Sequence, residues 1–479
     1  MKNSETPAPD NQAGKLHLHP LRSDINNRRE IFGWIMYDWA NSAFFTTVVG
    51  ALFGPYLTVM AQAAVGKGGT VLSFGPIGAV TAESLSTISV SASVFLQIFT
   101  LPILGALGDY SDLKKRLMMV FCYIAVAATC SLFFLQQGWH LFGAAMFIIA
   151  NLSYGASIVF YNAYLPEITS EDQRDKISSR GFALGYLGGG LLLALNLVLV
   201  QGAERLGISA GMAVRLSFLS AGVWWGGFAI VTFLLLKKRP ASRALPPNHS
   251  YLTVGFREIA STFRELLRNR QALRYLIGYL TYNDGIQTVI GAAGVFLSQE
   301  LFESRGLATP PSFLLSIFLM VQFVAFFGAL LFERIARWLG TKRAILISLV
   351  IWAGIVIYAY SMLSTVNEAW VMGALIAIVL GGSQALSRSL FSRMIPEGRE
   401  SSFFGIYEVS ERGTSWIGPL VFSIVVARTG SYRQAILSLI FFFIAGLLIL
   451  IFTNTDRAVH EAGNYLPEEL EGRAKAPSV

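Results

Sequence analysis

Charged side chains interrupt one long apolar stretch of the sequence, from about residue 402 to residue 427. This stretch is long enough to cross a bilayer, yet it contains Glu408, Glu411 and Arg412, and charges at that depth are costly unless they face protein or water. Glu408 and Arg412 are four residues apart and share one helix face, and Glu411 has the same spacing to Ser415. We expect Arg412 to bind an anionic group of a solute while one of the acids carries a proton. The alternative is an intrahelical ion pair that only lowers the cost of insertion.

Two other apolar stretches each carry a carboxylate and an amide on one helix face. Asp38 and Asn41 are three residues apart in the first stretch. Asp284 and Gln287 have the same spacing in the seventh stretch, where Asn283 precedes the acid. Membrane proteins built from repeats place binding sites at the repeat interface, so we expect both faces to line such an interface. Hydrogen bonds between packed helices are the alternative.

Other polar residues of the apolar stretches allow a structural interpretation. Asn151 and Tyr154 share a face in the fourth stretch, and both packing and solute contact remain open for them. Arg388 and Arg393 end the tenth stretch, and we expect them to reach the surface or to pair with loop acids. Three amides are expected to join helices by hydrogen bonds: Gln97, Asn196 and Gln322.

The sequence contains no pattern typical of an enzyme or of an ATP-driven pump. It has no phosphate-binding loop, no GxSxG nucleophile motif and no histidine set that would bind a metal. We therefore expect a protein that is not an enzyme and needs no cofactor or metal. Movement of a solute would then be passive or driven by an ion gradient, with Asp284, Glu408 and Glu411 as candidate proton carriers.

The composition is that of a protein that crosses the membrane many times. Hydrophobic residues make up 54% and charged residues 14% of the 479 residues, with a mean hydropathy of +0.55. The polar first thirty residues contain no cleavable signal peptide. Twelve apolar segments have spanning length: 31–60, 83–107, 117–135, 141–164, 180–201, 214–236, 273–298, 312–332, 344–364, 370–391, 402–427 and 434–453.

The positive charges indicate how these segments are oriented. With both termini in the cytoplasm, 31 of the 37 Lys and Arg residues fall on the cytoplasmic side. The net charge of +8 is thus a topology signal, and we expect no nucleic-acid partner. We expect a multi-pass protein, in the inner membrane if the source is bacterial. The six outer residues are Lys67, Arg205, Arg215, Arg305, Arg428 and Arg433.

The longest polar stretch divides the chain into two halves of six segments. It contains a basic amphipathic pattern, with Ile259, Phe263, Leu266 and Leu267 at helical spacing. Short motifs recur at equivalent segments of the two halves, such as GAL at 105–107 and 328–330. The predicted fold is all-α, with twelve transmembrane helices in two pseudo-symmetric bundles. The predicted divisions are 1–30 (tail), 31–236 (bundle), 237–272 (linker), 273–453 (bundle) and 454–479 (tail).

The segment GALGDYSDLKKR, at 105–116, resembles the loop motif of the major facilitator superfamily. That resemblance implies a gating role: Gly105 permits close helix packing, and Asp109 caps a neighbouring helix or pairs with an arginine. The match departs from the usual pattern at Tyr110 and Asp112. In the second half the motif is degraded, with Glu333 as the one plausible acid. The basic run that follows Asp109 consists of Lys114, Lys115 and Arg116.

A narrower resemblance covers most of the chain. The segments YDWANS (37–42), YNAYLPE (161–167), YNDG (282–285), GGSQALSRS (381–389) and ERGTSWIGP (411–419) resemble the branch of vacuolar amino-acid effluxers linked to autophagy and their bacterial relatives. The resemblance implies a transporter, with amino acids as the favoured solute. We expect a monomeric secondary transporter of a small polar solute, and the embedded acids make protons the expected coupling ion. A sugar or drug transporter of the same fold is the alternative. A membrane sensor is a weaker alternative, because the tails are short.

Overall fold

The chain folds almost entirely into long helices that lie roughly parallel. The computed structural model describes residues 25–73, 79–243, 251–413 and 417–466, with the side chains of 251–256, 311 and 412–413 left out. The first half contains α1 (Arg28–Ala43), a π-helix (Phe44–Leu52), α2 (Phe53–Val65), α3 (Leu85–Tyr110), α4 (Lys114–Ser131), α5 (His140–Ile168), α6 (Arg174–Gln201) and α7 (Ala210–Leu235). The strands β1 (Thr70–Ser73) and β2 (Ala79–Thr81) pair antiparallel between α2 and α3.

The second half begins after a separate linker helix, α8 (Tyr251–Arg268). Short 3-10 turns occupy Leu132–Phe134, Glu171–Gln173 and Glu303–Arg305. The helices of the second half are α9 (Arg270–Leu301), α10 (Pro311–Leu339), α11 (Thr341–Ser361), α12 (Val366–Arg393), α13 (Glu400–Gly413), α14 (Ile417–Thr429), α15 (Tyr432–Ser438), α16 (Ile440–Ile451) and α17 (Thr455–Glu461).

The all-helical membrane fold is confirmed, and two of the twelve expected segments, 273–298 and 402–427, are not among the spans found in the part of the chain that the structure describes. Within the described residues, ten helical stretches are long and apolar enough to cross a membrane. The helix α9 is long enough but too polar to count among them. The expected segment 402–427 is described as two helices, α13 and α14, and the segment 434–453 divides into α15 and α16 at Leu439.

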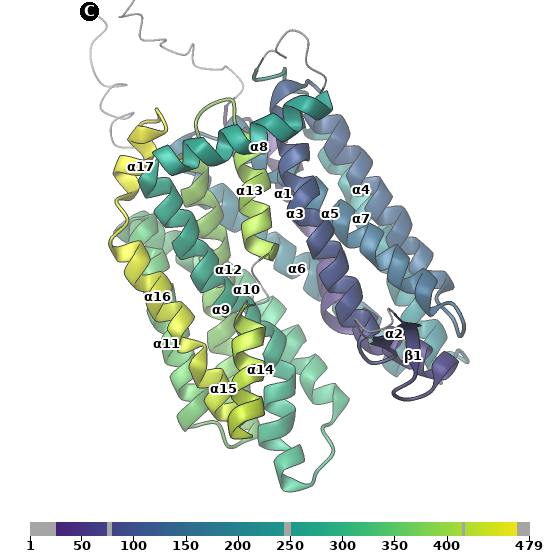
Figure 1. Ribbon diagram of the computed structural model, residues 1–479. Coiled ribbons are helices and arrows are strands. Elements are labelled where there is room, and N and C mark those ends of the chain that lie inside the picture. The colour runs from purple at the N-terminus through teal and green to yellow at the C-terminus, as the bar shows by residue number, and fades with distance from the viewer. Residues whose placement is uncertain (1–24, 74–78, 244–250, 414–416, 467–479) are drawn as a thin grey trace, which may run out of the picture.

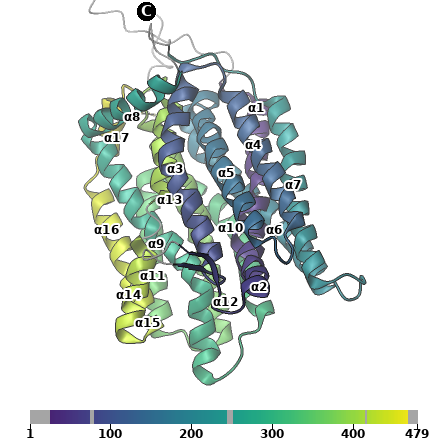
Figure 2. The same cartoon turned by 45° about the vertical axis from the view of Figure 1, so that its right-hand side comes forward.

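Two apolar cores correspond to the two halves of the chain. One core consists of buried residues between 34 and 236, and the other consists of residues between 266 and 459 together with Ala163. In Figures 1 and 2 the linker helix α8 crosses one end of the molecule, where α17 also lies. We call this the α8 end. The ribbons of the two halves lie close together there and spread apart toward the opposite end (Figure 1).

Glycines allow the two halves to approach closely at the α8 end. The helix α3 packs against α13, and a Cβ atom at Gly105 would clash with the backbone oxygen of Ser401. A Cβ atom at Gly405 would lie 2.9 Å from the backbone oxygen of Leu101. These small residues therefore bring two backbones into direct contact across the interface, as in other membrane helix pairs.

The buried face of the linker helix carries polar as well as apolar residues. Leu266 is buried, whereas Phe263 and Leu267 are 53% and 49% exposed. The polar residues Glu258 and Thr262 share the buried face with Leu266. Polar contacts, described below, fix this orientation of α8, and the expected position of the helix at the membrane surface stays a prediction.

Candidate functional site

One arginine of the second half is inserted among helices of the first half. Arg388, in α12, is 4% exposed. Its guanidinium Nη2 lies 3.4 Å from Oδ2 of Asp38 in α1, and its Nη1 donates a 3.1 Å hydrogen bond to Oδ1 of Asn162 in α5. Its Nε donates to the hydroxyl of Ser178 in α6 at 3.0 Å. Three helices of one bundle therefore bind one cation of the other bundle.

Aromatic rings surround this arginine. The guanidinium carbon lies 4.9 Å from the ring centre of Trp34, 5.5 Å from that of Tyr161 and 4.3 Å from that of Phe182. Such contacts stabilise a desolvated cation through the ring quadrupole. The hydroxyl of Tyr161 also donates a 2.7 Å hydrogen bond to Oδ2 of Asp38, so the acid has a second partner.

An acid of α13 completes the group. Asn162 donates from Nδ2 to Oε1 of Glu408 at 2.6 Å while its Oδ1 accepts from Arg388. Asp38 lies ten residues inside α1 and Glu408 eight residues inside α13, which places them about 12–15 Å from the helix ends. Arg388 lies five residues from the end of α12 and Ser178 four residues inside α6, so these members lie nearer the helix ends than the middle of the helices. We call it the interface cluster: Asp38, Tyr161, Asn162, Ser178, Arg388 and Glu408.

Sequence reasoning identified only part of the interface cluster. Asp38 and Glu408 were predicted as site residues, and the structure connects both to Asn162 or Arg388. The prediction that Arg388 reaches the surface or pairs with a loop acid was wrong, because its partner is the intramembrane Asp38. Arg393 does pair with an acid near the surface, Asp175, at 2.8 Å. The adjacent polar pair at 161–162, inside an apolar segment, was the signal for the residues that sequence reasoning missed.

Asp284 lies in a second polar group, within its own bundle. Its Oδ2 accepts a 2.9 Å hydrogen bond from the backbone N–H of Gly418 at the start of α14. Its Oδ1 is buried and has no hydrogen-bond partner among the described residues. Asn283 donates to the backbone oxygen of Glu411 at 3.2 Å, so this pair contacts both α13 and α14. The helix face that carries Asp38 and the one that carries Asp284 were expected at one interface, but they lie in different surroundings. Gln287 is half-buried.

Two further candidate residues take part in packing within the first bundle. Asn151 donates to Ser93 at 2.7 Å, and its backbone oxygen accepts from Gln97 at 3.0 Å. Tyr154 packs at 5.5 Å from the ring of Phe44. Asn41 is buried and Glu411 half-buried. Ser415 and the side chain of Arg412 lie outside the described residues, so the expected pair of Glu408 with Arg412 stays a prediction.

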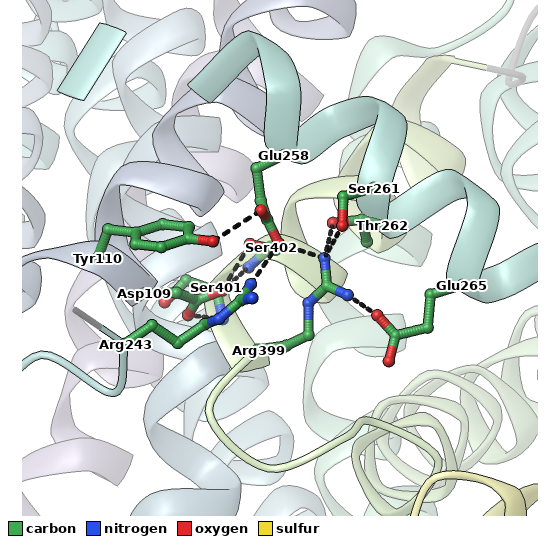
Figure 3. A network of polar contacts seen from close by, with 10 residues as sticks. All are labelled: Asp109, Tyr110, Arg243, Glu258, Ser261, Thr262, Glu265, Arg399, Ser401 and Ser402. Carbon is green, nitrogen blue, oxygen red and sulfur yellow. Dashed lines mark hydrogen bonds and ion pairs between the residues drawn. The ribbon is translucent and has the colours of Figure 1, made fainter. Parts of the chain in front are cut away.

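The loop motif at 105–116 joins the two bundles at the α8 end (Figure 3). Asp109, which is 1% exposed, accepts 2.9 Å hydrogen bonds from the backbone N–H groups of Ser401 and Ser402, and a third from the Ser402 hydroxyl at 2.5 Å. It therefore caps the first turn of α13, where the helix dipole favours a negative charge. We expected Asp109 either to cap a helix or to pair with an arginine, and the structure shows the helix cap.

The basic run of the motif holds the first bundle together. The Lys114 ammonium forms a buried ion pair with Glu167 at the end of α5. Lys115 donates to the backbone oxygen of Leu236, after α7, at 2.5 Å. Arg116 is exposed, and the degraded second copy contains a surface ion pair of Glu333 with Arg337.

The sequence matches known proteins over nearly its whole length. Residues 26–463 match the family described as "Vacuole effluxer Atg22 like". An uncharacterized MFS-type transporter, YxiO, of Bacillus subtilis (strain 168) is 30% identical over 440 residues, which cover 91% of this chain and 97% of the relative. Autophagy-related protein 22 of Yarrowia lipolytica (strain CLIB 122 / E 150) is 27% identical over 461 residues, covering 78% of this chain and 76% of the relative.

Solved structures of transporters share the fold at low sequence identity. The proton:xylose symporter XylE, bound to 6-bromo-6-deoxy-D-glucose, is 15% identical, with a TM-score of 0.66 and coverage of 93% of this chain and 99% of its own. The human organic anion transporter MFSD10 is 14% identical, with a TM-score of 0.63 and coverage of 88% and 99%. The chain is therefore a membrane transporter of the major facilitator superfamily and belongs to its Atg22-like vacuole effluxer family.

Proposed function

We propose that the protein is a secondary transporter that moves a small polar solute by alternating access, with amino acids as the favoured class. The observation that supports this most is the interface cluster, in which buried charges inside the helices join the two bundles. Intramembrane charges are expensive and usually functional. Contacts between two bundles, unlike contacts within one, must break when the bundles rock apart.

The proposed orientation places the α8 end in the cytoplasm. The excess of Lys and Arg on the side of the termini supports it. The bundles meet at that end through Asp109 and the first turn of α13. We propose that this arrangement is the outward-facing state, in which the cytoplasmic side is closed.

The chemistry of the interface cluster supports a zwitterion as the solute. Arg388 offers a planar fork for a carboxylate, and Asp38 or Glu408 offers an anion for an ammonium group. The solute would displace part of the Arg388 contacts and so weaken the link between the bundles. Arg412 stays a second candidate for the anion site.

Asp284 is the proposed carrier of a coupling proton. It is 2% exposed, and only one of its two oxygens has a hydrogen-bond partner among the described residues. Embedded acids of this kind form proton relays in pumps and transporters. Asp38 and Glu408, in contrast, have hydrogen-bond partners across the bundle interface.

A thermal-shift screen of the purified protein tests the substrate class. The panel contains the common amino acids, sugars including xylose, organic drugs and monovalent cations. A ligand that binds the folded state raises the melting temperature by mass action. We expect shifts with one group of amino acids. Shifts with sugars or drugs alone would contradict the amino-acid proposal, and a ligand that binds but never crosses proteoliposomes would support a sensor instead.

A further inference from the structure

The linker helix α8 carries a buried acid on its inner face. Glu258 is 5% exposed, although its neighbours Arg257 and Ala260 are exposed. A buried carboxylate is retained only where several donors satisfy it. The surroundings of Glu258 therefore show what holds the linker in place (Figure 3).

Two donors reach Glu258 from the side of the first bundle. The hydroxyl of Tyr110, the last residue of α3, donates to Oε2 at 2.9 Å. Arg243 donates to Oε1 at 2.6 Å, and its guanidinium carbon lies 4.8 Å from the Tyr110 ring centre. The backbone N–H of Arg243 donates to the backbone oxygen of Asp109 at 3.1 Å, so this arm is attached directly to the gating loop.

A third donor reaches the same carboxylate from the second bundle. Arg399, in the loop before α13, forms an ion pair with Glu258 through Nη2, which also donates to Thr262 at 2.8 Å. Its Nη1 forms an ion pair with Glu265. Burial lowers the pKa of the Arg399 guanidinium, and the Glu258 carboxylate opposes that shift. Arg399 closely precedes Ser401, the residue that Asp109 caps.

We propose that Glu258 is a positioning residue that latches the transporter closed at the α8 end. Its single carboxylate binds the end of α3 and the approach to α13, the two elements that must separate when this end opens. Opening therefore removes at least one donor from a buried charge, which is unfavourable. In this proposal the linker sets the balance between the states in which the α8 end is closed and open. A linker that only tethers the two bundles would not affect that balance. The proposal concerns the conformational balance and does not depend on which solute is carried.

The test measures how often the α8 end opens. Ser401 is fully buried between α3 and α13, and its hydroxyl has no hydrogen-bond partner among the described residues. Ser401→Cys, in a Cys122→Ala, Cys130→Ala background, reports opening through the rate of maleimide labelling of the full chain in nanodiscs. We expect Glu258→Gln to raise this rate roughly tenfold, equivalent to about 1.4 kcal/mol.

Glu265→Gln is the matched control. It removes an acid from the same helix, but among the contacts drawn in Figure 3 this acid is paired only with Arg399, so the first bundle is unaffected. We expect labelling within about twofold of the parent, since no bridge between the bundles is lost. An equal rise in both variants would overturn the proposal, because general loosening of α8 would explain it.

Tyr110→Phe provides a milder variant if Glu258→Gln does not fold. It removes one hydroxyl donor and keeps the ring that Arg243 contacts. We expect a smaller rise in labelling, of roughly threefold, with little change in melting temperature. Labelling of Tyr110→Phe at the parental rate would overturn the latch. If Glu258→Gln folds, labelling of that variant at the parental rate would overturn it as well. A lowered melting temperature without faster labelling would show a role in stability only.

Discussion

At the scale of single residues, Arg388 is the side chain on which the proposed solute site depends. It binds Asp38, Asn162 and Ser178 through different nitrogens of one planar group. A lysine would keep the charge but lose this fork. The position of Arg388 at the end of an apolar segment did not predict this, because its burial depends on the packing of α12 against α6 of the other bundle.

We expect Arg388→Lys to fold but to bind the solute roughly thirtyfold more weakly. The reason is that lysine cannot make charged hydrogen bonds that we expect to contribute about 2 kcal/mol to binding. The dissociation constant comes from a thermal-shift titration with the amino acid found in the screen. Arg393→Lys, which changes the pair with Asp175 near the surface, is the control. Parental transport by the double variant Asp38→Asn, Arg388→Gln would show that the cluster is only structural.

Asp284→Asn tests proton coupling. The amide keeps an acceptor for the Gly418 N–H but cannot carry a proton. In proteoliposomes we expect solute exchange to continue and accumulation driven by a pH gradient to be lost. The control is Glu300→Gln, in the same helix, whose partner is Arg433 at 2.7 Å. Full pH-driven accumulation by Asp284→Asn would contradict its assignment as the proton carrier.

At the scale of elements, the contact of α3 with the start of α13 closes the α8 end. Asp109→Asn removes a charge that caps α13 through three hydrogen bonds. We expect the transport rate to fall roughly tenfold, with solute affinity within about twofold, because the capped helix end holds a conformation and contacts no solute. Uptake assays and titrations with Asp112→Asn, an exposed acid of the same loop, provide the comparison. A collapse of affinity with normal exchange would refute the gating role.

Most helices could be predicted from apolar length, but several local features could not. The Asp109 motif indicated a helix cap or an arginine partner, and the structure shows the cap, on α13 of the other bundle. Glu408 also binds Asn162 of the other bundle, a contact that the spacing within its own helix did not predict. Contacts of this kind depend on how the two bundles pack together. The spacing of residues along the chain gives no information about that packing. The same reason applies to Glu258, whose buried face depends on Tyr110 and Arg399.

At the scale of the whole molecule, the proposed topology places both termini and the linker in the cytoplasm. Ser242 lies in the exposed part of the linker that the structure describes. In a Cys122→Ala, Cys130→Ala background, we expect Ser242→Cys in intact cells to react only with a membrane-permeant reagent. An impermeant maleimide should label it after the cells are broken. Labelling from outside intact cells would invert the assignment of the α8 end and of the outward-facing state.

The central claim is that the bundles must separate at the α8 end in every transport cycle. A Cβ atom at Gly108 would lie 2.9 Å from that of Ser401, which is closer than the 3.5–4.5 Å usual in a disulfide, so α3 and α13 must shift slightly apart to admit the bond. Gly108→Cys with Ser401→Cys, in the cysteine-free background, should therefore crosslink on oxidation. The measurement is counterflow of the identified amino acid in proteoliposomes before and after reduction. We predict no counterflow while the crosslink is intact and recovery after reduction, whereas undiminished counterflow through the crosslinked protein would contradict alternating access.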